Sequence, residues 1–370
     1  MIKKHIPYVD LISQHSSIKE QILTAVEQVL SHAQFINGEE ITDFEKAFAQ
    51  FCEVRFAIGV NSGTDGLILA LHALGVGPGD EVITPPNSFI ASSSCVAWVG
   101  ARPVFVDVRE DYNIDFTQIE DKITPRTKAI LPIHLTGRPA EMQTIMEIAK
   151  RYNLYVIEDC SQAVSAEYYS QRVGSFGDVG VFSLHPLKTL NACGDSGIIT
   201  TDDVEIYEEL LLLRNHGLRS RDDCATWGLN SRLDSVQAAI LLIKMDYLDW
   251  WTEKRISNAK YYQKALSEME SIKLPEDRPY EKAVYHTFVV EIHNRDTLRS
   301  YLLEHDIETS VHYPVPIHLQ VAAKDLGYKR GDFPMTERQS GQILSLPVHQ
   351  NLQDGDLDYV VKTIKAFYSR

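Results

Sequence analysis

The chain has 370 residues, a formal net charge of −15 at pH 7 and 44% hydrophobic residues. No block of Lys and Arg alternates with aromatic residues, which argues against an extended nucleic-acid surface. The N-terminus lacks a signal-peptide pattern and no run of about 18 apolar residues occurs, so we expect a cytoplasmic protein with no membrane segment. A single core rarely exceeds about 250 to 300 residues, and we therefore predict a large domain over residues 1–250 and a smaller α+β domain over 251–370.

Residues 54–200 alternate short β-branched runs with longer helical patterns, which is typical of a parallel sheet covered by helices. Gly- and Pro-rich turns separate these runs. The predicted helices between the strands cover 64–74, 89–99 and 140–152. The seven predicted strands are 56–60, 81–84, 103–107, 128–133, 154–158, 179–184 and 197–200. The fold class is therefore α/β, with a large, mostly parallel seven-stranded sheet.

The second half of the chain changes character. Residues 234–266 have the pattern of one or two long helices, and a charged, Pro-containing segment at 276–279 interrupts it. An alternating run at 283–292, a helix at 296–305 and a Pro-rich loop at 311–317 follow. This order predicts the smaller α+β domain, which begins within the long helical stretch.

Cysteine and histidine spacing gives little sign of metal or redox chemistry. The five cysteines form no C-x-x-C pair, and none of the 13 histidines forms an H-E-x-x-H motif. We therefore predict free thiols and no metal site.

Lys188 is the most informative residue of the chain. It follows an apolar run and lies in a turn, beyond Pro186, where a lysine can act as a Schiff-base nucleophile. Asp159 ends another apolar run, with Gln162 three residues later. Pyridoxal phosphate (PLP) requires an amine that reacts with its aldehyde and a carboxylate that pairs with its pyridine nitrogen. The alternative interpretation of Asp159 is a structural aspartate that accepts a hydrogen bond from a backbone amide.

A third motif provides an anion site. Ser62, Gly63 and Thr64 follow a predicted strand and begin a helix, where unpaired N–H groups and the helix dipole favour a phosphate. A simple helix N-cap is the alternative. Ser183 lies five residues before Lys188, where its hydroxyl can bind the same phosphate. Phe89 can stack on a cofactor ring, although a core phenylalanine would look the same.

Together these motifs resemble the DegT/DnrJ family of sugar aminotransferases, which have the fold type I architecture of PLP enzymes. The resemblance runs through nearly the whole chain and includes 6–11, 62–65, 158–163, 183–188, 228–234 and 311–318. It implies that Lys188 forms the Schiff base and that Asp159 pairs with the pyridine nitrogen. It also implies a homodimer that transfers an amino group from an amino acid, L-glutamate in relatives, to a keto sugar that is usually nucleotide-linked.

The resemblance also assigns the remaining site residues. Gln162 would lie near the 3-hydroxyl of the cofactor and Phe89 on the opposite face of the ring. Asn230 would reach the phosphate from the other subunit. Tyr313 and His318 match a loop that lines the sugar end of the site in relatives. Apart from the resemblance, Arg219 is a candidate for contacting a diphosphate or a carboxylate of the substrate, although it can equally be a surface or interface arginine.

Two positions depart from the usual family pattern. Ser196 replaces a glycine in the loop 194–197, and Cys160 and Ser161 replace the smaller residues that often follow the aspartate.

Four other functions remain to be weighed. An aminotransferase for an oxo sugar acid of the octulosonate type would use the same residues. A PLP-dependent sugar dehydratase characteristically has histidine where this chain has Lys188. A non-catalytic regulator would lack Lys188 or Asp159, and a nicotinamide enzyme would have G-x-G-x-x-G after its first strand, which is missing here.

Overall fold

The computed structural model describes residues 5–369. Besides five short 3-10 helices, it contains eleven α-helices within this range. They are α1 (Leu11–Ser16), α2 (Lys19–His32), α3 (Glu39–Cys52), α4 (Gly63–Ala73), α5 (Ala91–Trp98), α6 (Met142–Tyr152), α7 (Val204–Leu213), α8 (Ser235–Leu266), α9 (Arg295–Glu304), α10 (Pro334–Gln342) and α11 (Asp354–Tyr368).

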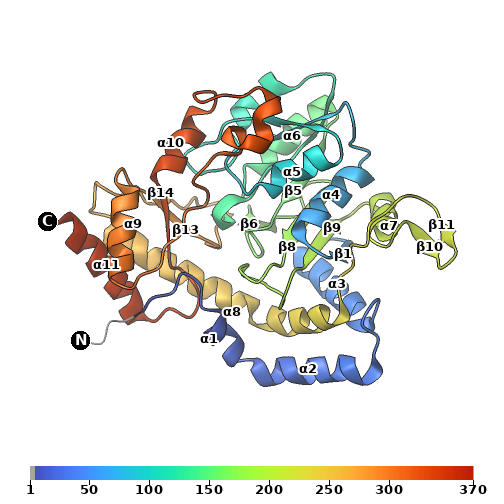
Figure 1. Cartoon of the computed structure of the whole chain (residues 1–370), viewed down its shortest axis with the longest axis horizontal. Coiled ribbons are helices and arrows are strands. Elements are labelled where there is room, and N and C mark those ends of the chain that lie inside the picture. The colour runs from blue at the N-terminus through green and yellow to red at the C-terminus, as the bar shows by residue number, and fades with distance from the viewer. Residues whose placement is uncertain (1–4, 370) are drawn as a thin grey trace.

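A seven-stranded sheet forms the centre of the molecule, in the order β1-β9-β8-β5-β4-β2-β3. Only β9 runs antiparallel to its neighbours. Figure 1 shows helices on both sides of this sheet. Its strands are β1 (Phe56–Val60), β2 (Glu81–Thr84), β3 (Arg102–Phe105), β4 (Thr127–Ile130), β5 (Tyr155–Asp159), β8 (Val179–Ser183) and β9 (Gly197–Thr201). The mixed α/β class and the seven predicted strands are thus confirmed.

The strands are buried because helices cover both faces of the sheet. All residues of β2 and β9 are buried, and β1, β5 and β8 each have one terminal residue that is only partly buried or exposed. Such strands appear in sequence as continuous apolar runs, which is why their positions could be predicted within two or three residues.

Smaller sheets lie around the central one. Three strands form an antiparallel ribbon beside the sheet, and two others pair near the C-terminus. A hairpin projects from the right of Figure 1. These strands are β6 (Glu167–Tyr168), β7 (Gln171–Arg172) and β12 (Glu281–Lys282); β13 (Phe288–Glu291) and β14 (Ile343–Leu346); and, in the hairpin, β10 (Leu218–Ser220) and β11 (Asp223–Cys224).

Helix α8 joins two hydrophobic cores. Its first half packs Leu241 and Leu248 beneath the central sheet, and its second half packs Tyr262 and Leu266 into a core with β13, β14, α9 and α11. The helix is continuous across residue 250, so the predicted one or two long helices are a single helix. The division at residues 250 and 251 stays a prediction, and Ile6 from the N-terminal segment packs into the second core.

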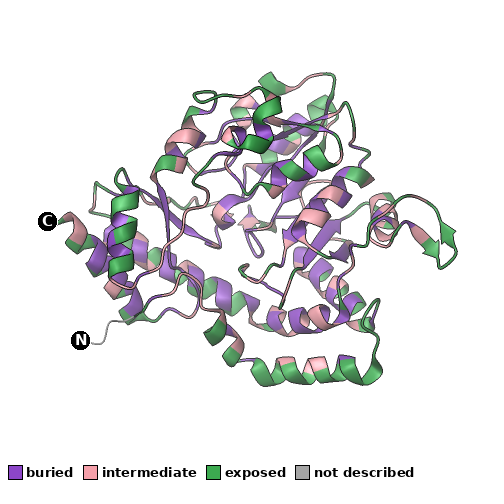
Figure 2. Ribbon diagram, in the orientation of Figure 1, coloured by how far each residue is buried: buried purple, intermediate pink, exposed green. Residues whose placement is uncertain are grey.

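The outer surface varies in burial from element to element. Figure 2 shows α2 largely exposed, and Val29 is its one buried residue. Within residues 5–369, no helix combines the length and apolar character that crossing a bilayer requires.

Candidate active site

A cavity of about 410 Å³ opens beside the ends of β1, β5 and β8. These strands lie near one another in the sheet, with β9 between β1 and β8, so their ends reach the same edge. The residues that follow or end them line the cavity: Ser62, Gly63, Thr64, Asp159, Ser183 and Lys188. We call these six residues the sheet wall. Ligands of parallel α/β folds commonly bind at such an edge.

Lys188 lies in the loop after β8, where two hydrogen bonds fix its backbone. Its N–H donates to the carbonyl of His185 at 2.8 Å, and its carbonyl accepts from Asn191 Nδ2 at 2.8 Å. Burial of the ammonium lowers the pKa of Lys188 to about 8, and the Asp159 carboxylate opposes this shift. The amine is therefore neutral far more often than an exposed lysine, which is the form a Schiff-base nucleophile needs.

Asp159 is the last residue of β5 and is 6% exposed. Its Oδ1 accepts the backbone N–H of Ser161 at 3.0 Å. No lysine, arginine or histidine within residues 5–369 forms an ion pair with it, and a buried carboxylate needs such a partner. A protonated pyridine nitrogen would satisfy this need.

The start of α4 forms an anion cradle. Ser62 caps the helix and accepts the N–H of Asp65 at 3.1 Å, while the N–H groups of Gly63 and Thr64 donate to no acceptor in the described part of the chain. A Cβ on Gly63 would lie 2.8 Å from Ser183 Cβ, so this close approach of α4 to β8 requires glycine. The predicted N-cap and the predicted anion site are therefore the same structure.

Ser196 adds a polar atom to this wall. The residue is 1% exposed and lines the cavity, yet its Oγ has no hydrogen-bond partner among the described residues. A buried hydroxyl without a partner is costly. Together with the two unused N–H groups of the α4 cradle, it fits a phosphate-bearing ligand. The residues therefore fit PLP, with Lys188 for its aldehyde and Asp159 for its ring nitrogen.

Three further predicted residues also line the cavity. Gln162 Oε1 accepts the N–H of Thr136 at 2.7 Å, and its Nε2 lies 3.5 Å from the Tyr313 hydroxyl. The Phe89 ring is 56% exposed and lies 5.8 Å from the Tyr313 ring. An exposed ring at the mouth of a cavity leaves a face available for stacking.

His318 lies elsewhere, contrary to the expectation from sequence. It is 2% exposed, packs against Phe333, and its Nε2 contacts Glu337 Oε1 at 3.1 Å. It does not line the cavity. Within the loop 311–318, His312 and Tyr313 line the cavity, whereas His318 does not.

Arg219 and Asn230 do not reach the cavity of their own chain either. Arg219 lies in the exposed hairpin strand β10, and Asn230 pairs with Asn215 through an isolated β-bridge. A role for either residue in this cavity would require a second chain.

The cavity is also lined by residues that were not among the candidates from sequence. We call Tyr8, Arg255, His286, His312 and His349 the histidine wall. They come from the N-terminal segment, α8 and three separate loops. Tyr8 and His312 lie in the segments 6–11 and 311–318 that carry the family resemblance, but no sequence spacing links them to Arg255, His286 or His349.

Burial keeps the imidazoles of the histidine wall neutral. It lowers the pKa of His312 and of His349 to about 4, with the charge of Lys188 adding to the effect at His312 and that of Arg255 at His349. The pKa of His286 lies well below its usual range because of burial, followed by the charges of Lys188 and Arg255. The three imidazoles of the histidine wall are therefore neutral hydrogen-bonding groups, and the charges that act on them are those of Lys188 and Arg255.

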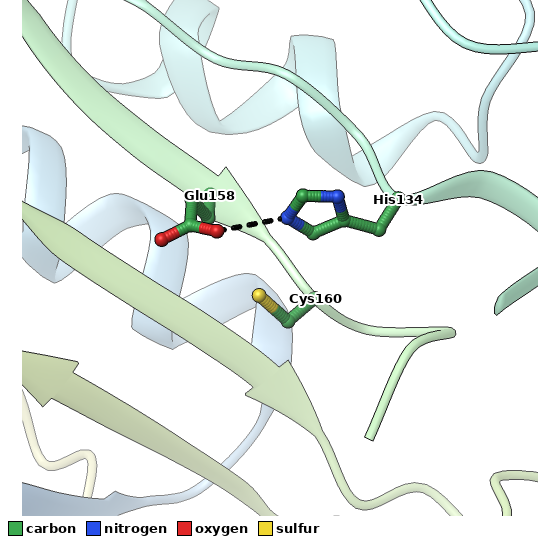
Figure 3. Close-up of side chains that lie close together, drawn as sticks. All are labelled: His134, Glu158 and Cys160. Atoms are coloured by element: carbon green, nitrogen blue, oxygen red, sulfur yellow. Dashed lines mark hydrogen bonds and ion pairs between the residues drawn. The ribbon is translucent and has the colours of Figure 1, made fainter. Parts of the chain in front are cut away.

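A second polar cluster lies just behind Asp159. Figure 3 shows His134, Glu158 and Cys160 together, an arrangement that could hold a metal ion. Glu158, however, accepts from His134 Nε2 at 3.0 Å and from three backbone N–H groups, of Gly174, Phe176 and Gly177. His134 Nδ1 accepts the N–H of Ala140 at 3.0 Å. The ligand atoms of His134 and Glu158 are thus engaged in structural hydrogen bonds that hold the end of β5.

Comparison with known proteins agrees with this geometry. Residues 16–365 match the model of the DegT/DnrJ/EryC1/StrS aminotransferase family. The chain belongs to this family. Its members are PLP-dependent aminotransferases, and the fold is that of fold type I PLP enzymes.

Individual relatives cover essentially the whole chain. It is 40% identical to the dTDP-3-amino-3,4,6-trideoxy-alpha-D-glucose transaminase of Streptomyces venezuelae, over 99% of this chain and 97% of the relative. It is 41% identical to the dTDP-3-amino-3,6-dideoxy-alpha-D-galactopyranose transaminase of Aneurinibacillus thermoaerophilus, over 98% and 99%. The crystal structure of S. venezuelae DesV in complex with a ketimine intermediate superimposes with a TM-score of 0.97 at 40% identity, covering 99% of both chains.

Proposed function

We propose that this aminotransferase moves an amino group from L-glutamate to a nucleotide-linked keto sugar in amino-sugar biosynthesis. The observation that carries the proposal is the sheet wall. Around one cavity it places the Lys188 amine with its lowered pKa, the buried Asp159 carboxylate without an ion-pair partner, and backbone N–H groups of α4 that have no acceptor among the described residues. These are the three requirements of PLP chemistry.

Each residue of the sheet wall has a distinct task in this proposal. When bound, PLP supplies an electron sink that stabilises a carbanion at the donor's Cα. Asp159 keeps the ring nitrogen protonated through a charge-assisted hydrogen bond. Lys188, once released by the incoming amine, moves a proton between the donor's Cα and the adjacent cofactor carbon with its Nζ. The phosphate would be held by Ser62, Gly63, Thr64 and Ser183. Gln162 would lie beside the cofactor ring, and Phe89 would stack on the ring.

The acceptor is proposed from the relatives together with the cavity. Both relatives described above are named for a 3-amino sugar linked to dTDP, which supports a nucleotide-linked 3-keto sugar as the substrate of this chain. Tyr313 lines the cavity between Gln162 and Phe89 and is the proposed contact for the sugar ring. An oxo sugar acid is the second candidate, and Lys188 itself argues against a dehydratase.

We also propose an active homodimer in the cytoplasm, in which Asn230 and Arg219 of one subunit complete the site of the other. Large apolar side chains near Asn230 support a subunit interface, since Trp227 is 89% exposed and Leu229 is 41% exposed. The hairpin that carries Arg219 projects away from its own chain (Figure 1), as a segment that reaches a neighbour would.

The acceptor test uses enzyme loaded with pyridoxamine phosphate. We expect a dTDP- or UDP-linked 3-keto sugar to restore the absorption band of the lysine-bound cofactor. Restoration by an octulosonate-type sugar acid alone would overturn the nucleotide-sugar assignment. Failure of every keto compound, with no response to any amino acid, would overturn the transaminase itself.

The dimer test combines light scattering with subunit mixing. We expect twice the monomer mass of 41.9 kDa. Mixing inactive Lys188→Ala subunits with impaired Asn230→Asp subunits should restore part of the activity, because one site of each mixed dimer would contain both native residues. A monomeric active enzyme would contradict the proposal.

A further inference from the structure

Arg255 is a buried cation without an acidic partner. The residue is 5% exposed, lies in the second half of α8 and lines the active-site cavity. Within residues 5–369 it forms no salt bridge, and the phenol of Tyr8 is the one titratable group that supports its charge. An unpaired buried charge is costly and is rarely retained without a function.

The other buried arginines show what this position lacks. Arg138 is 4% exposed and forms ion pairs with Glu281 and, at 3.4 Å, with Asp277. Arg295 is 8% exposed and lies 2.6 Å from Asp296. Both are therefore satisfied by carboxylates of the chain itself. Arg255 alone among these three lines the active-site cavity, and it alone forms no ion pair with a carboxylate.

The hydrogen bonds of Arg255 leave one edge of its guanidinium unused. Nη1 donates to the carbonyls of Tyr285 at 3.4 Å and His286 at 3.3 Å. Nε is enclosed and has no partner, while Nη2 bonds no atom of residues 5–369 and is not enclosed. Nε–H and one Nη2–H point in the same direction, and this edge matches the two oxygens of a carboxylate.

The surroundings favour an anion from outside the chain. Arg255 Nη1 donates to the His286 carbonyl at 3.3 Å, and both residues line the same cavity as Lys188. A donor whose amino group takes the place of Lys188 on the cofactor would therefore have Arg255 in the same cavity to receive its carboxylate. His286 Nδ1 and His349 Nδ1 are also buried without partners on this wall. The phosphate cradle belongs to the sheet wall and does not occupy this position.

We propose that the guanidinium of Arg255 binds a carboxylate of the amino donor through Nη2, the nitrogen that is neither enclosed nor bonded. This inference rests on the proposed transaminase function and assigns the donor's carboxylate to a residue outside the cofactor-binding motifs. The donor class is thereby an amino acid, and Arg255 orients its Cα toward Lys188.

The first test measures binding without turnover. PLP-loaded enzyme is titrated with glutarate, a dicarboxylate that has no amino group, and binding is followed by calorimetry. We expect Arg255→Met to weaken glutarate binding about 10- to 100-fold, as loss of charge-assisted hydrogen bonds predicts. Arg255→Lys keeps the positive charge and loses the planar guanidinium, so its Kd for glutarate should lie between those of the wild type and Arg255→Met. This second variant keeps the test informative if Arg255→Met does not fold. Arg151→Met, which removes an exposed arginine from α6, should bind as the wild type does.

The second test separates a carboxylate contact from a structural role. In the donor half-reaction, Arg255→Met should raise the apparent Kd for L-glutamate about 10- to 100-fold. It should leave the slow reaction of a carboxylate-free amine, such as propylamine, within about twofold of the wild type. Equal losses for both donors, or unchanged glutarate binding, would overturn the proposal.

Two remaining outcomes also decide the question. A defect confined to the half-reaction with a keto sugar acid would assign Arg255 to the acceptor and overturn the donor assignment. If no amino acid reacts with the wild-type enzyme, the proposed transaminase function fails. Glutarate binding still shows in that case whether Arg255 is a carboxylate site.

Discussion

The two groups of residues that line the active-site cavity, the sheet wall and the histidine wall, are built in different ways. The sheet wall consists of short segments that follow adjacent strands, and its backbone N–H groups, Lys188 and Asp159 are fixed by local hydrogen bonds. The histidine wall gathers single residues from the N-terminal segment, α8 and three loops. The first wall has the features of a cofactor site. The second offers an unpaired guanidinium and neutral imidazoles, which suit a ligand that enters and leaves.

The difference gives the two walls different expected roles. The sheet wall supplies the groups that cofactor chemistry needs, and the histidine wall supplies groups that a substrate can contact. Substitutions on the sheet wall should therefore damage chemistry or cofactor binding, and those on the histidine wall should alter substrate affinity.

The sharpest test of this division is Lys188→Ala. We expect the rate of the donor half-reaction to fall about 10⁴-fold, because the proton shuttle and the covalent link are both lost. Cofactor should still bind through the α4 cradle, as measured by absorbance after gel filtration. Lys150→Ala, an exposed lysine of α6, is the control. A variant that retained normal rates would remove Lys188 from the mechanism.

Asp159→Asn should produce the next largest effect. The amide can still accept the Ser161 N–H, but it cannot stabilise a protonated ring nitrogen. Loss of one charge-assisted hydrogen bond predicts about a 10- to 100-fold slower half-reaction in stopped-flow absorbance.

The adjacent residue provides a matched comparison. Glu158 faces away from the cavity and accepts three backbone N–H groups and His134. Glu158→Gln should therefore lower the free energy of unfolding by about 1 to 3 kcal/mol, which thermal denaturation would show as a lower melting temperature. The half-reaction rate of the folded enzyme should stay within about twofold of the wild type. Equal kinetic losses at both positions would contradict the distinction.

The pH dependence of cofactor capture sharpens the comparison further. Apoenzyme should react with PLP about tenfold faster for each pH unit up to about 8 and level off above it, because the neutral amine of Lys188 is the nucleophile. His312 and His349, with pKa values of about 4, stay neutral throughout and add no inflection between pH 6 and 7. A single break near 10.5 in stopped-flow measurements would show that burial does not activate Lys188.

The smallest predicted effect concerns the departure at Ser196. If its unpaired Oγ donates to the cofactor phosphate, Ser196→Gly should raise the Kd for PLP about 2- to 10-fold, as expected for one neutral hydrogen bond. Fluorescence titration of the apoenzyme measures this change. Unchanged or tighter binding would instead mean that the hydroxyl serves no ligand.

The sequence by itself determined the central sheet and the sheet wall. Strands buried on both faces are continuous apolar runs, and the chemical residues follow them directly, so Ser62, Asp159, Ser183 and Lys188 could be located by their distance from a strand end. The helix N-cap at Ser62 is likewise a local signal, since capping involves residues only three positions apart.

Only the tertiary structure decided the histidine wall. Tyr8 and His349 are separated by most of the chain. His349 Nε2 lies 3.2 Å from the carbonyl of Pro7 because both ends of the chain pack against the second core, to which Ile6 and Val348 belong. The choice between His312 and His318 also depended on packing, because both lie in one loop and only the fold shows which is directed into the cavity. The unpaired state of Arg255 is invisible in sequence for the same reason: it is defined by carboxylates that are absent from its three-dimensional surroundings.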